Sequence, residues 1–162
     1  MSRELYERDY VAWLAEQAAA MRRLAAQRTN IPLDLELLAE EMDDMARELR
    51  AACASHTATI IQHLLKLQYS PAEEPRRGWE NTVRSARLNL RKRITTTIGN
   101  ELEDELEELY RLARSNARND LEQFHEKDAA KRLPRHCPYT LEQIRNPEWW
   151  PARAVVGTSV GD

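Results

Sequence analysis

The stretch Asp34–Tyr69, with the sequence DLELLAEEMDDMARELRAACASHTATIIQHLLKLQY, decides the fold of this protein. It contains neither proline nor glycine, and its apolar positions recur in steps of three and four, the spacing of one face of an α-helix. These positions are Leu35, Leu38, Met42, Met45, Leu49, Ala52, His56, Ile60, His63 and Leu67. Unbroken, the helix would be about 54 Å long. We expect the other segments to pack along it.

The segments that flank this helix are predicted from their end signals. A shorter helix is predicted from Asp9, its N-cap, to about Gln27, and a short connection should return it antiparallel to the long helix. Asp34 is the expected cap of the long helix, which should end before Pro71 because a residue that precedes proline avoids the α-helical region.

Two more helices are predicted after the Pro71–Gly78 loop. The third runs from Trp79 to about Ile98, and Gly99 suits the position just past its end. Asn100 and Glu103 form a predicted capping box at the start of a fourth helix, which is predicted to end near Lys127.

A final short helical turn is predicted near the end of the chain. Thr140 and Gln143 form its capping box, and the adjacent Trp149 and Trp150 should anchor the segment to the body of the protein. The predicted fold class is all-α: a bundle of four main helices around one very long helix, plus a short C-terminal helical segment. We expect one helical domain over residues 1–151 and a flexible tail over 152–162.

The composition excludes several functional classes. The chain has 162 residues, a net charge of -3 and 4 glycines, so it offers no strong global attraction to nucleic acid and no glycine-rich phosphate loop. Its 2 cysteines, Cys53 and Cys137, form no disulfide framework. No apolar run reaches the length of a membrane span, and the start of the chain lacks the apolar core of a signal peptide. We therefore expect a cytoplasmic protein that contacts no membrane.

Helix lengths predict incomplete cover for the first half of the long helix. The helix from Asp9 to Gln27 reaches only that half, and the two helices after Pro71 fold back chiefly on the other half. A second copy of the chain could complete the cover, which gives the hypothesis of a two-fold homodimer. The alternative is a break in the long helix between Ala51 and Ser55 that produces a closed monomer.

Several stretches together carry a resemblance to a known family. The chain resembles the bacterial domain-of-unknown-function family numbered twenty-nine in His63–Pro71, Trp79, Thr82, Val83 and Arg87, in Asp9-Tyr10, Trp13-Leu14, Asp34-Leu35-Glu36 and Glu40-Glu41-Met42, and in Cys137–Gln143. It departs from the family pattern at Leu67, where an aromatic is usual, and at Thr97-Ile98-Gly99. The resemblance implies a helical bacterial protein and carries over no activity, catalytic residue or cofactor.

One candidate binding or interaction site lies where the long helix meets the third helix. It comprises His63, Lys66, Tyr69, Trp79 and Arg87, which could form a small anion pocket or a docking site for a partner protein. The simpler interpretation is that His63 is a hydrogen-bonded core histidine and that Tyr69 and Trp79 pack the corner.

Metal sites have weaker support in the sequence. The pairs Glu41/Asp44 and Glu101/Asp104 resemble the acidic helices that hold magnesium in all-α nucleotide pyrophosphatases. However, Asp44 points away from the apolar face, as expected for a solvated position. We therefore predict no metal and no cofactor.

Nucleic-acid binding is a further alternative. Arg84, Arg87 and Arg91 form a stripe that could meet phosphates, but the acidic start of the fourth helix is expected to neutralise it. The function predicted is a small protein-interaction or regulatory module that presents helical surfaces, either to a second copy of itself in a homodimer or to an unidentified protein. The alternatives are a nucleic-acid-associated regulator of the antitoxin type and, last, a metal-dependent hydrolase; an enzyme is not favoured.

Overall fold

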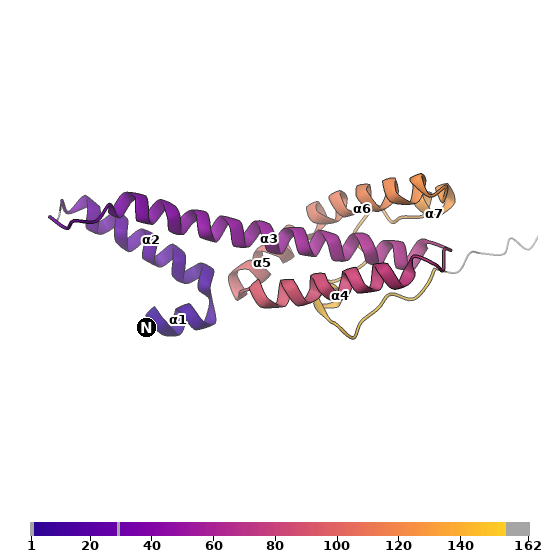
Figure 1. Cartoon of the computed structure of the whole chain (residues 1–162), viewed down its shortest axis with the longest axis horizontal. Coiled ribbons are helices and arrows are strands. Elements are labelled where there is room, and N and C mark those ends of the chain that lie inside the picture. Colours follow the sequence, from indigo (N-terminus) through magenta and orange to yellow (C-terminus); the bar gives the residue numbers. More distant parts are fainter. Residues whose placement is uncertain (1, 29, 155–162) are drawn as a thin grey trace, which may run out of the picture. The chain divides into compact units, whose positions relative to one another are not determined.

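The computed structural model describes residues 2–28 and 30–154, and within these residues the chain forms helices and no strands (Figure 1). The predicted all-α fold is therefore confirmed. The helices are α1 (Ser2–Arg8), α2 (Tyr10–Ala26), α3 (Leu35–Tyr69), α4 (Arg76–Arg93), α5 (Thr96–Asp104), α6 (Leu106–Gln123), α7 (Lys127–Lys131) and α8 (Leu141–Arg145). None of the helices in this part of the chain is both long enough and apolar enough to cross a membrane.

The long helix α3 is continuous from Leu35 to Tyr69. The expectation of a single long helix is confirmed, and the alternative of a break between Ala51 and Ser55 is wrong. At its start the backbone N of Leu37 donates to Oδ1 of Asp34 at 3.0 Å, which is the predicted cap. At its end, Ser70 and Pro71 leave the helix as the proline requires.

The chain divides into two compact units that share α3. The N-terminal unit comprises Met1–Ser55 and Lys92–Asp104, and the C-terminal unit comprises His56–Arg91 and Glu105–Asp162. The first part of α3 thus supplies the scaffold of one unit, and its last part supplies that of the other. A single domain over residues 1–151 stays a prediction.

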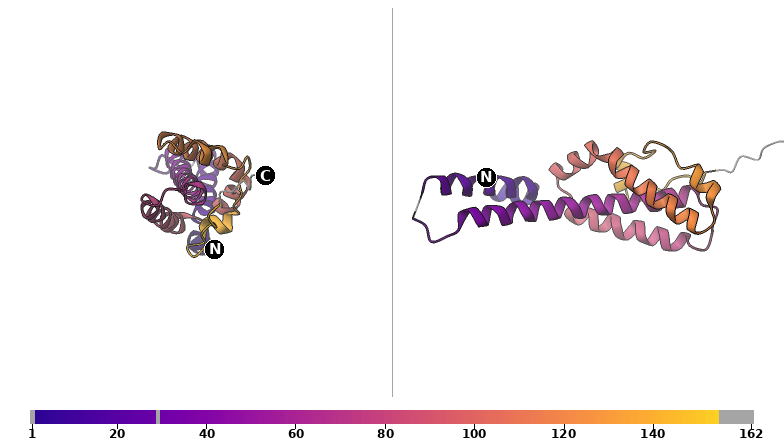
Figure 2. Two further views of the ribbon diagram at one scale, coloured as in Figure 1. Left: turned by 90° about the vertical axis from the view of Figure 1, so that its right-hand side faces the viewer. Right: turned by 90° about the horizontal axis from the view of Figure 1, so that it is seen from above.

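In the N-terminal unit, α2 runs beside the first part of α3 (Figures 1 and 2). Arg22 and Asp43 pair across these helices at 2.6 Å. The buried residues are small where the helices meet: α3 contributes Ala39, Ala46 and Cys53, seven positions apart, and α2 contributes Val11, Leu14 and Ala18.

The buried face of this part of α3 lies one residue further along than predicted. Leu38 and Met45 were expected on it, yet they are 38% and 46% exposed, whereas Ala39 and Ala46 are buried. A step of one residue rotates the position by about 100° around a helix. The small alanine side chains allow the neighbouring helix to approach closely, and this leaves the larger neighbouring side chains in solvent.

The predicted third and fourth helices are divided differently in the structure. The third helix stops at Arg93, and a separate helix, α5, begins at Thr96 and contains Gly99 and Asn100. The predicted C-terminal glycine at Gly99 and the predicted capping box at Asn100 are therefore wrong. The fourth helix, α6, begins only at Leu106. Its N-cap residue is Glu105, whose side chain forms no capping hydrogen bond.

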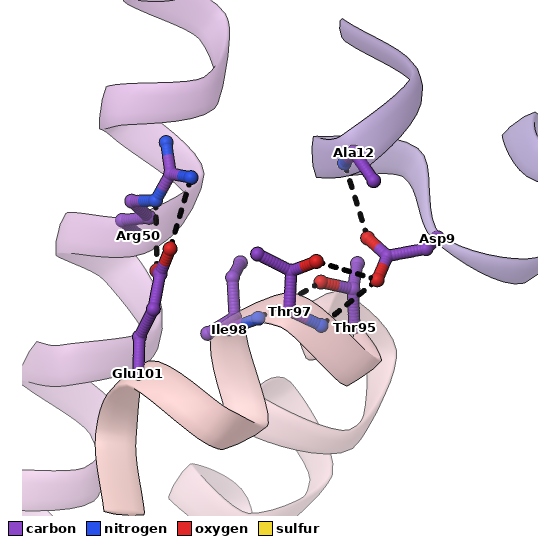
Figure 3. Close-up of polar contacts among 7 residues, drawn as sticks. All are labelled: Asp9, Ala12, Arg50, Thr95, Thr97, Ile98 and Glu101. Atoms are coloured by element: carbon purple, nitrogen blue, oxygen red, sulfur yellow. Dashed lines mark hydrogen bonds and ion pairs between the residues drawn. The ribbon is translucent and has the colours of Figure 1, made fainter. Parts of the chain in front are cut away.

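Asp9 explains the break before α5 (Figure 3). Its carboxylate accepts from the backbone N of Ala12 at 3.1 Å, and so it is the predicted N-cap of α2. It also accepts from the backbone N and Oγ1 of Thr97, each at 2.8 Å. Thr95 Oγ1 accepts from the N of Ile98 at 3.2 Å. The start of α5 is therefore held by a residue far away in the sequence as well as by a local threonine.

In the C-terminal unit, α4 and α6 run beside the last part of α3 (Figures 1 and 2). Consecutive α3 residues are buried here, which shows that this part of the helix is covered on more than one side. The core consists of Ile60, Ile61, Leu64, Leu65, Val83, Leu90, Tyr110, Leu121 and Ile144.

The C-terminal segment closes this unit. Thr140 and Gln143 form the predicted capping box at the start of α8, which is confirmed. Helices α1 and α7 were not predicted. Within the predicted tail, the N of Ala154 donates to the carbonyl O of Gln68 at 2.8 Å and Arg153 pairs with Glu73 at 2.5 Å. The remainder of that tail, from residue 155, lies outside the described residues.

Candidate functional site

Lys66 lies at the centre of a polar cluster in the C-terminal unit. Its Nζ is 2.8 Å from Oδ2 of Asp120 on α6, and its side chain is only 7% exposed. The same carboxylate oxygen accepts from Nε2 of Gln62 at 2.9 Å. Nζ also lies 5.1 Å from the centre of the Trp79 ring, within the range of a cation–π contact. The buried ammonium is thus balanced by one carboxylate and one aromatic face.

His63 lies beside this cluster as a packed residue. Its Nδ1 donates to the carbonyl O of Thr59 at 2.9 Å, one turn earlier in α3. Burial lowers the pKa of His63 below its usual 6.5, and the positive charge of Lys66 adds to the effect. The imidazole is therefore neutral at pH 7, with its Nδ1 proton held by the backbone.

Tyr69 and Arg132 form a separate contact at the end of α3. Arg132 Nη2 donates to the carbonyl O of Tyr69 at 2.9 Å, and its guanidinium carbon lies 5.9 Å from the centre of the Tyr69 ring. Tyr69 also lines a cavity of about 300 Å³ together with Ser70, Pro71, Glu73, Arg132, Arg153 and Ala154. Tyr69 therefore contacts the segment that follows α6 and helps to hold it in place.

Arg87 on α4 binds the C-terminal segment through main-chain oxygens. Nε donates to the carbonyl O of Ile144 at 2.8 Å, and Nη2 donates to those of Gln143 at 3.1 Å and Trp149 at 2.9 Å. The guanidinium carbon lies 4.9 Å from the centre of the Trp150 ring. The predicted anchoring role of the adjacent tryptophans is therefore realised through Arg87.

The electrostatics of Arg87 are unusual because its bonded partners carry no full charge. The residue is 4% exposed, and its Nη1 is buried without a hydrogen-bond acceptor among the described residues. Burial lowers the pKa of Arg87 from 12.5 to about 10, so the guanidinium remains protonated at pH 7. The protein thus holds a buried positive charge that carbonyl dipoles compensate only in part.

The five residues predicted as one site therefore have separate partners. His63 and Trp79 lie beside Lys66, which pairs with Asp120, whereas Tyr69 contacts Arg132 and Arg87 contacts the α8 segment. Sequence reasoning missed Asp120, Gln62 and Arg132. The available signal for Asp120 was its position beside Leu121 and three residues after Ala117 on the apolar face of α6, where a carboxylate needs a partner.

The weak metal candidates are not assembled into a site. Within residues 2–28 and 30–154, no three His, Cys, Asp or Glu side chains are arranged to hold a metal ion. Glu101 instead accepts from Nε and Nη2 of Arg50 at 2.8 and 3.0 Å, a two-point ion pair within the N-terminal unit (Figure 3). Asp44 pairs with Arg47, one turn later in α3.

A basic cavity lies between α4 and the end of α8. Its volume is about 110 Å³, and it is lined by Arg84, Arg87, Leu88, Arg91, Arg145 and Pro147. The acidic start of the fourth helix was expected to neutralise this stripe. The ion-pair partner of Arg84 is instead Glu80 on its own helix, at 3.7 Å, and the partners of Arg87 are carbonyls.

A family model matches residues 5–150, and its description is "Domain of unknown function DUF29". The chain belongs to the DUF29 family. The resemblance seen in the sequence is thereby confirmed over nearly the whole DUF29 chain.

A solved structure shares the fold of this DUF29 chain. It is an α-helical protein of unknown function from Rhodospirillum rubrum ATCC 11170, with a TM-score of 0.80 and 25% sequence identity. The similarity covers 89% of this chain and 90% of that one. No curated protein shows significant similarity to the DUF29 chain. The family and the fold are therefore established, and function must be argued from the surfaces and sites described above.

Proposed function

We propose that the chain is a protein-interaction module whose N-terminal unit assembles with a second copy of itself into a two-fold homodimer. The observation that carries this proposal is a set of exposed apolar side chains: Leu37, Leu38 and Met45 in the first part of α3, and Ile31 and Leu33 in the loop before it. Their exposed fractions are 51%, 38%, 46%, 38% and 59%. We call these five residues the outer stripe. Several large apolar side chains exposed on one short segment are typical of an interaction site.

The stripe has the geometry of a second helix-packing face. Leu38 and Met45 are one heptad apart, and they lie beside the face of Ala39, Ala46 and Cys53 that is buried in the N-terminal unit. A helix in a four-helix bundle packs against two neighbours. Two hairpins of α2 and α3, one from each copy, would supply the second neighbour that the outer stripe requires.

Charge favours contact between α3 of one copy and α2 of the other. By their helical spacing, Glu41 and Glu48 lie between Leu37 and Met45 around α3, and Asp44 lies beside Leu37. Two α3 helices facing each other would therefore bring like charges together. At the end of α2, Arg23 is exposed and forms no ion pair within the described residues. Arg22 on α2 pairs with Asp43 on α3. Because the two helices are antiparallel and Arg23 follows Arg22, Arg23 lies at about the same height along the hairpin as Glu41. A two-fold axis parallel to the hairpins would place the partner's Arg23 at that same level.

The two cysteines agree with a cytoplasmic setting for this dimer. Cys53 is buried and Cys137 is half-buried, and within the described residues neither forms a disulfide. Burial raises the pKa of Cys53, and the same cause raises the pKa of Cys137. Both groups are therefore protonated at pH 7 and resist oxidation, as suits proteins of a reducing compartment.

Mass in dilute solution tests the proposal. Sedimentation equilibrium at micromolar concentrations should give about twice the chain mass of 18.9 kDa. The double variant Leu38→Glu/Met45→Glu places charges in the outer stripe and should give the monomer mass with unchanged helix content. The matched control Leu112→Glu/Phe124→Glu changes two residues of the C-terminal unit that are 56% and 72% exposed, and should remain dimeric. A wild-type mass of 18.9 kDa throughout this range would overturn the proposal.

A further inference from the structure

The geometry points to a binding site for a phosphate monoester in the basic cavity between α4 and the end of α8. This inference concerns the C-terminal unit and is independent of the dimer proposed above. The cavity is lined by four arginines, Arg84, Arg87, Arg91 and Arg145, and by the apolar residues Leu88 and Pro147.

The arginines are gathered by the fold and not by a single sequence motif. Arg84, Arg87, Leu88 and Arg91 occupy positions i, i+3, i+4 and i+7 of α4 and therefore share one helix face. Arg145 is the last residue of α8, and the bonds from Arg87 to the carbonyls of Gln143 and Ile144 fix α8 against that face. The same contacts that close the C-terminal unit thus bring a fourth arginine to the cavity.

Positive charge in the cavity exceeds the negative charge available to it. Glu80 is the one described carboxylate in ion-pair contact with these arginines, and it lies 3.7 Å from Arg84. Arg91 and Arg145 are exposed and form no ion pair within the described residues, and the nearby Glu142 and Glu148 form none either. Arg87 adds a buried positive charge to one side of the cavity, and its hydrogen bonds go to the uncharged carbonyls of Ile144, Gln143 and Trp149. An anion in the cavity would relieve this excess.

The number of guanidiniums favours a phosphate monoester over a carboxylate. At pH 7 a monoester carries a charge of about −1.5 to −2 and three acceptor oxygens, which matches several two-point guanidinium donors. A carboxylate has a single charge and two oxygens. The cavity of about 110 Å³ is several times larger than the roughly 10–15 Å³ that a water molecule requires. Leu88 and Pro147 provide apolar contact for the group that bears the phosphate.

Trp150 provides an internal reporter of binding. Its ring lies 5.2 Å from the Arg84 guanidinium carbon and 4.9 Å from that of Arg87. An anion bound to these arginines should therefore shift the indole resonance of Trp150. The indole of Trp79 faces Lys66, at 5.1 Å from its Nζ, and should be unaffected.

Calorimetric titration with phenyl phosphate, with the Trp150 indole followed by NMR, tests the site. The wild-type chain should bind saturably, with a shift of the indole signal that is lost in Trp150→Phe. The double variant Arg91→Gln/Arg145→Gln removes two exposed charges that make no ion pair within the described residues, and should weaken binding at least tenfold. The control Arg111→Gln/Arg135→Gln has the same net charge and changes exposed residues outside the cavity, so its affinity should fall less than twofold.

Three outcomes would overturn the assignment. The first is no saturable binding of phenyl phosphate by the wild-type chain. The second is an equal loss of affinity in the two double variants, which would show attraction to general surface charge. The third is binding of benzoate or of a short single-stranded oligonucleotide, lost in Arg91→Gln/Arg145→Gln, without binding of phenyl phosphate. That result would assign the cavity to carboxylates or phosphodiesters.

Discussion

Asp9 accepts hydrogen bonds from both the backbone N and Oγ1 of Thr97, each at 2.8 Å, across 88 positions of the chain. The same carboxylate accepts from the backbone N of Ala12 at 3.1 Å. One side chain therefore satisfies the free N–H groups at the start of two helices, α2 and α5. In doing so it holds the N-terminal unit together, since these helices come from opposite ends of that unit in the sequence.

Replacement of Asp9 should cost more than the loss of one helix cap. Asp9→Ala removes the acceptor from both α2 and α5, and we expect the free energy of unfolding to fall by about 2–3 kcal/mol, against about 1 kcal/mol for a typical cap. The control Asp34→Ala removes a side chain that caps only α3. Urea unfolding followed by circular dichroism measures both, and equal losses would contradict the double role.

The contribution of Asp9 should depend on pH. Burial alone would raise the pKa of Asp9, but hydrogen bonds from Thr97 and Ala12 outweigh burial and lower it below the usual 3.8. A carboxyl with a lowered pKa in the folded state stabilises the fold above its unfolded pKa, and this stabilisation is lost as pH falls through the folded value. The difference in unfolding free energy between the wild type and Asp9→Asn should therefore be constant near pH 7 and shrink below about pH 4. A difference that stays constant down to pH 3 would refute this.

Removal of the Asp120 charge should destabilise the C-terminal unit. Asp120→Asn leaves the Lys66 ammonium, 7% exposed, without its counter-charge. Breaking a fully buried pair costs about 3–5 kcal/mol, and we expect roughly 2–3 kcal/mol here because Asp120 is 33% exposed. The control Arg118→Gln breaks the surface pair with Glu122 on the same helix and should cost at most about 0.5 kcal/mol. Chemical unfolding of the two variants gives the comparison, and similar losses would contradict the buried role of Lys66.

Loss of the Arg87 guanidinium should release the C-terminal segment. Arg87→Met keeps an apolar stem in the core but leaves the carbonyls of Gln143, Ile144 and Trp149 without their donor. We expect a loss of at least about 2 kcal/mol, as for hydrogen bonds to charged groups. Hydrogen exchange should accelerate over residues 141–150. The control Arg91→Met, four residues later on α4, should leave exchange in this segment unchanged, and unchanged exchange in Arg87→Met would refute the anchoring role.

Local signals in the sequence predicted much of the fold. The long helix follows from the apolar spacing of Asp34–Tyr69, and its ends follow from Asp34 and Pro71. The short helix α8 follows from Thr140 and Gln143, which bond within one turn. These features are readable because the interactions that produce them join residues only a few positions apart.

Only the tertiary structure decided where the chain breaks between Arg93 and Thr96, because the cap of α5 comes from Asp9, far away in the sequence. It also decided that Ala39 and not Leu38 is buried, since periodicity cannot tell which of two adjacent faces a neighbouring helix covers. Arg87 was predicted in a binding site and in a basic stripe, but its role depends on main-chain oxygens of α8, which carry no signature in side-chain identity. Backbone acceptors become specific partners only after folding has placed them, and for this reason the basic cavity is a property of the folded chain.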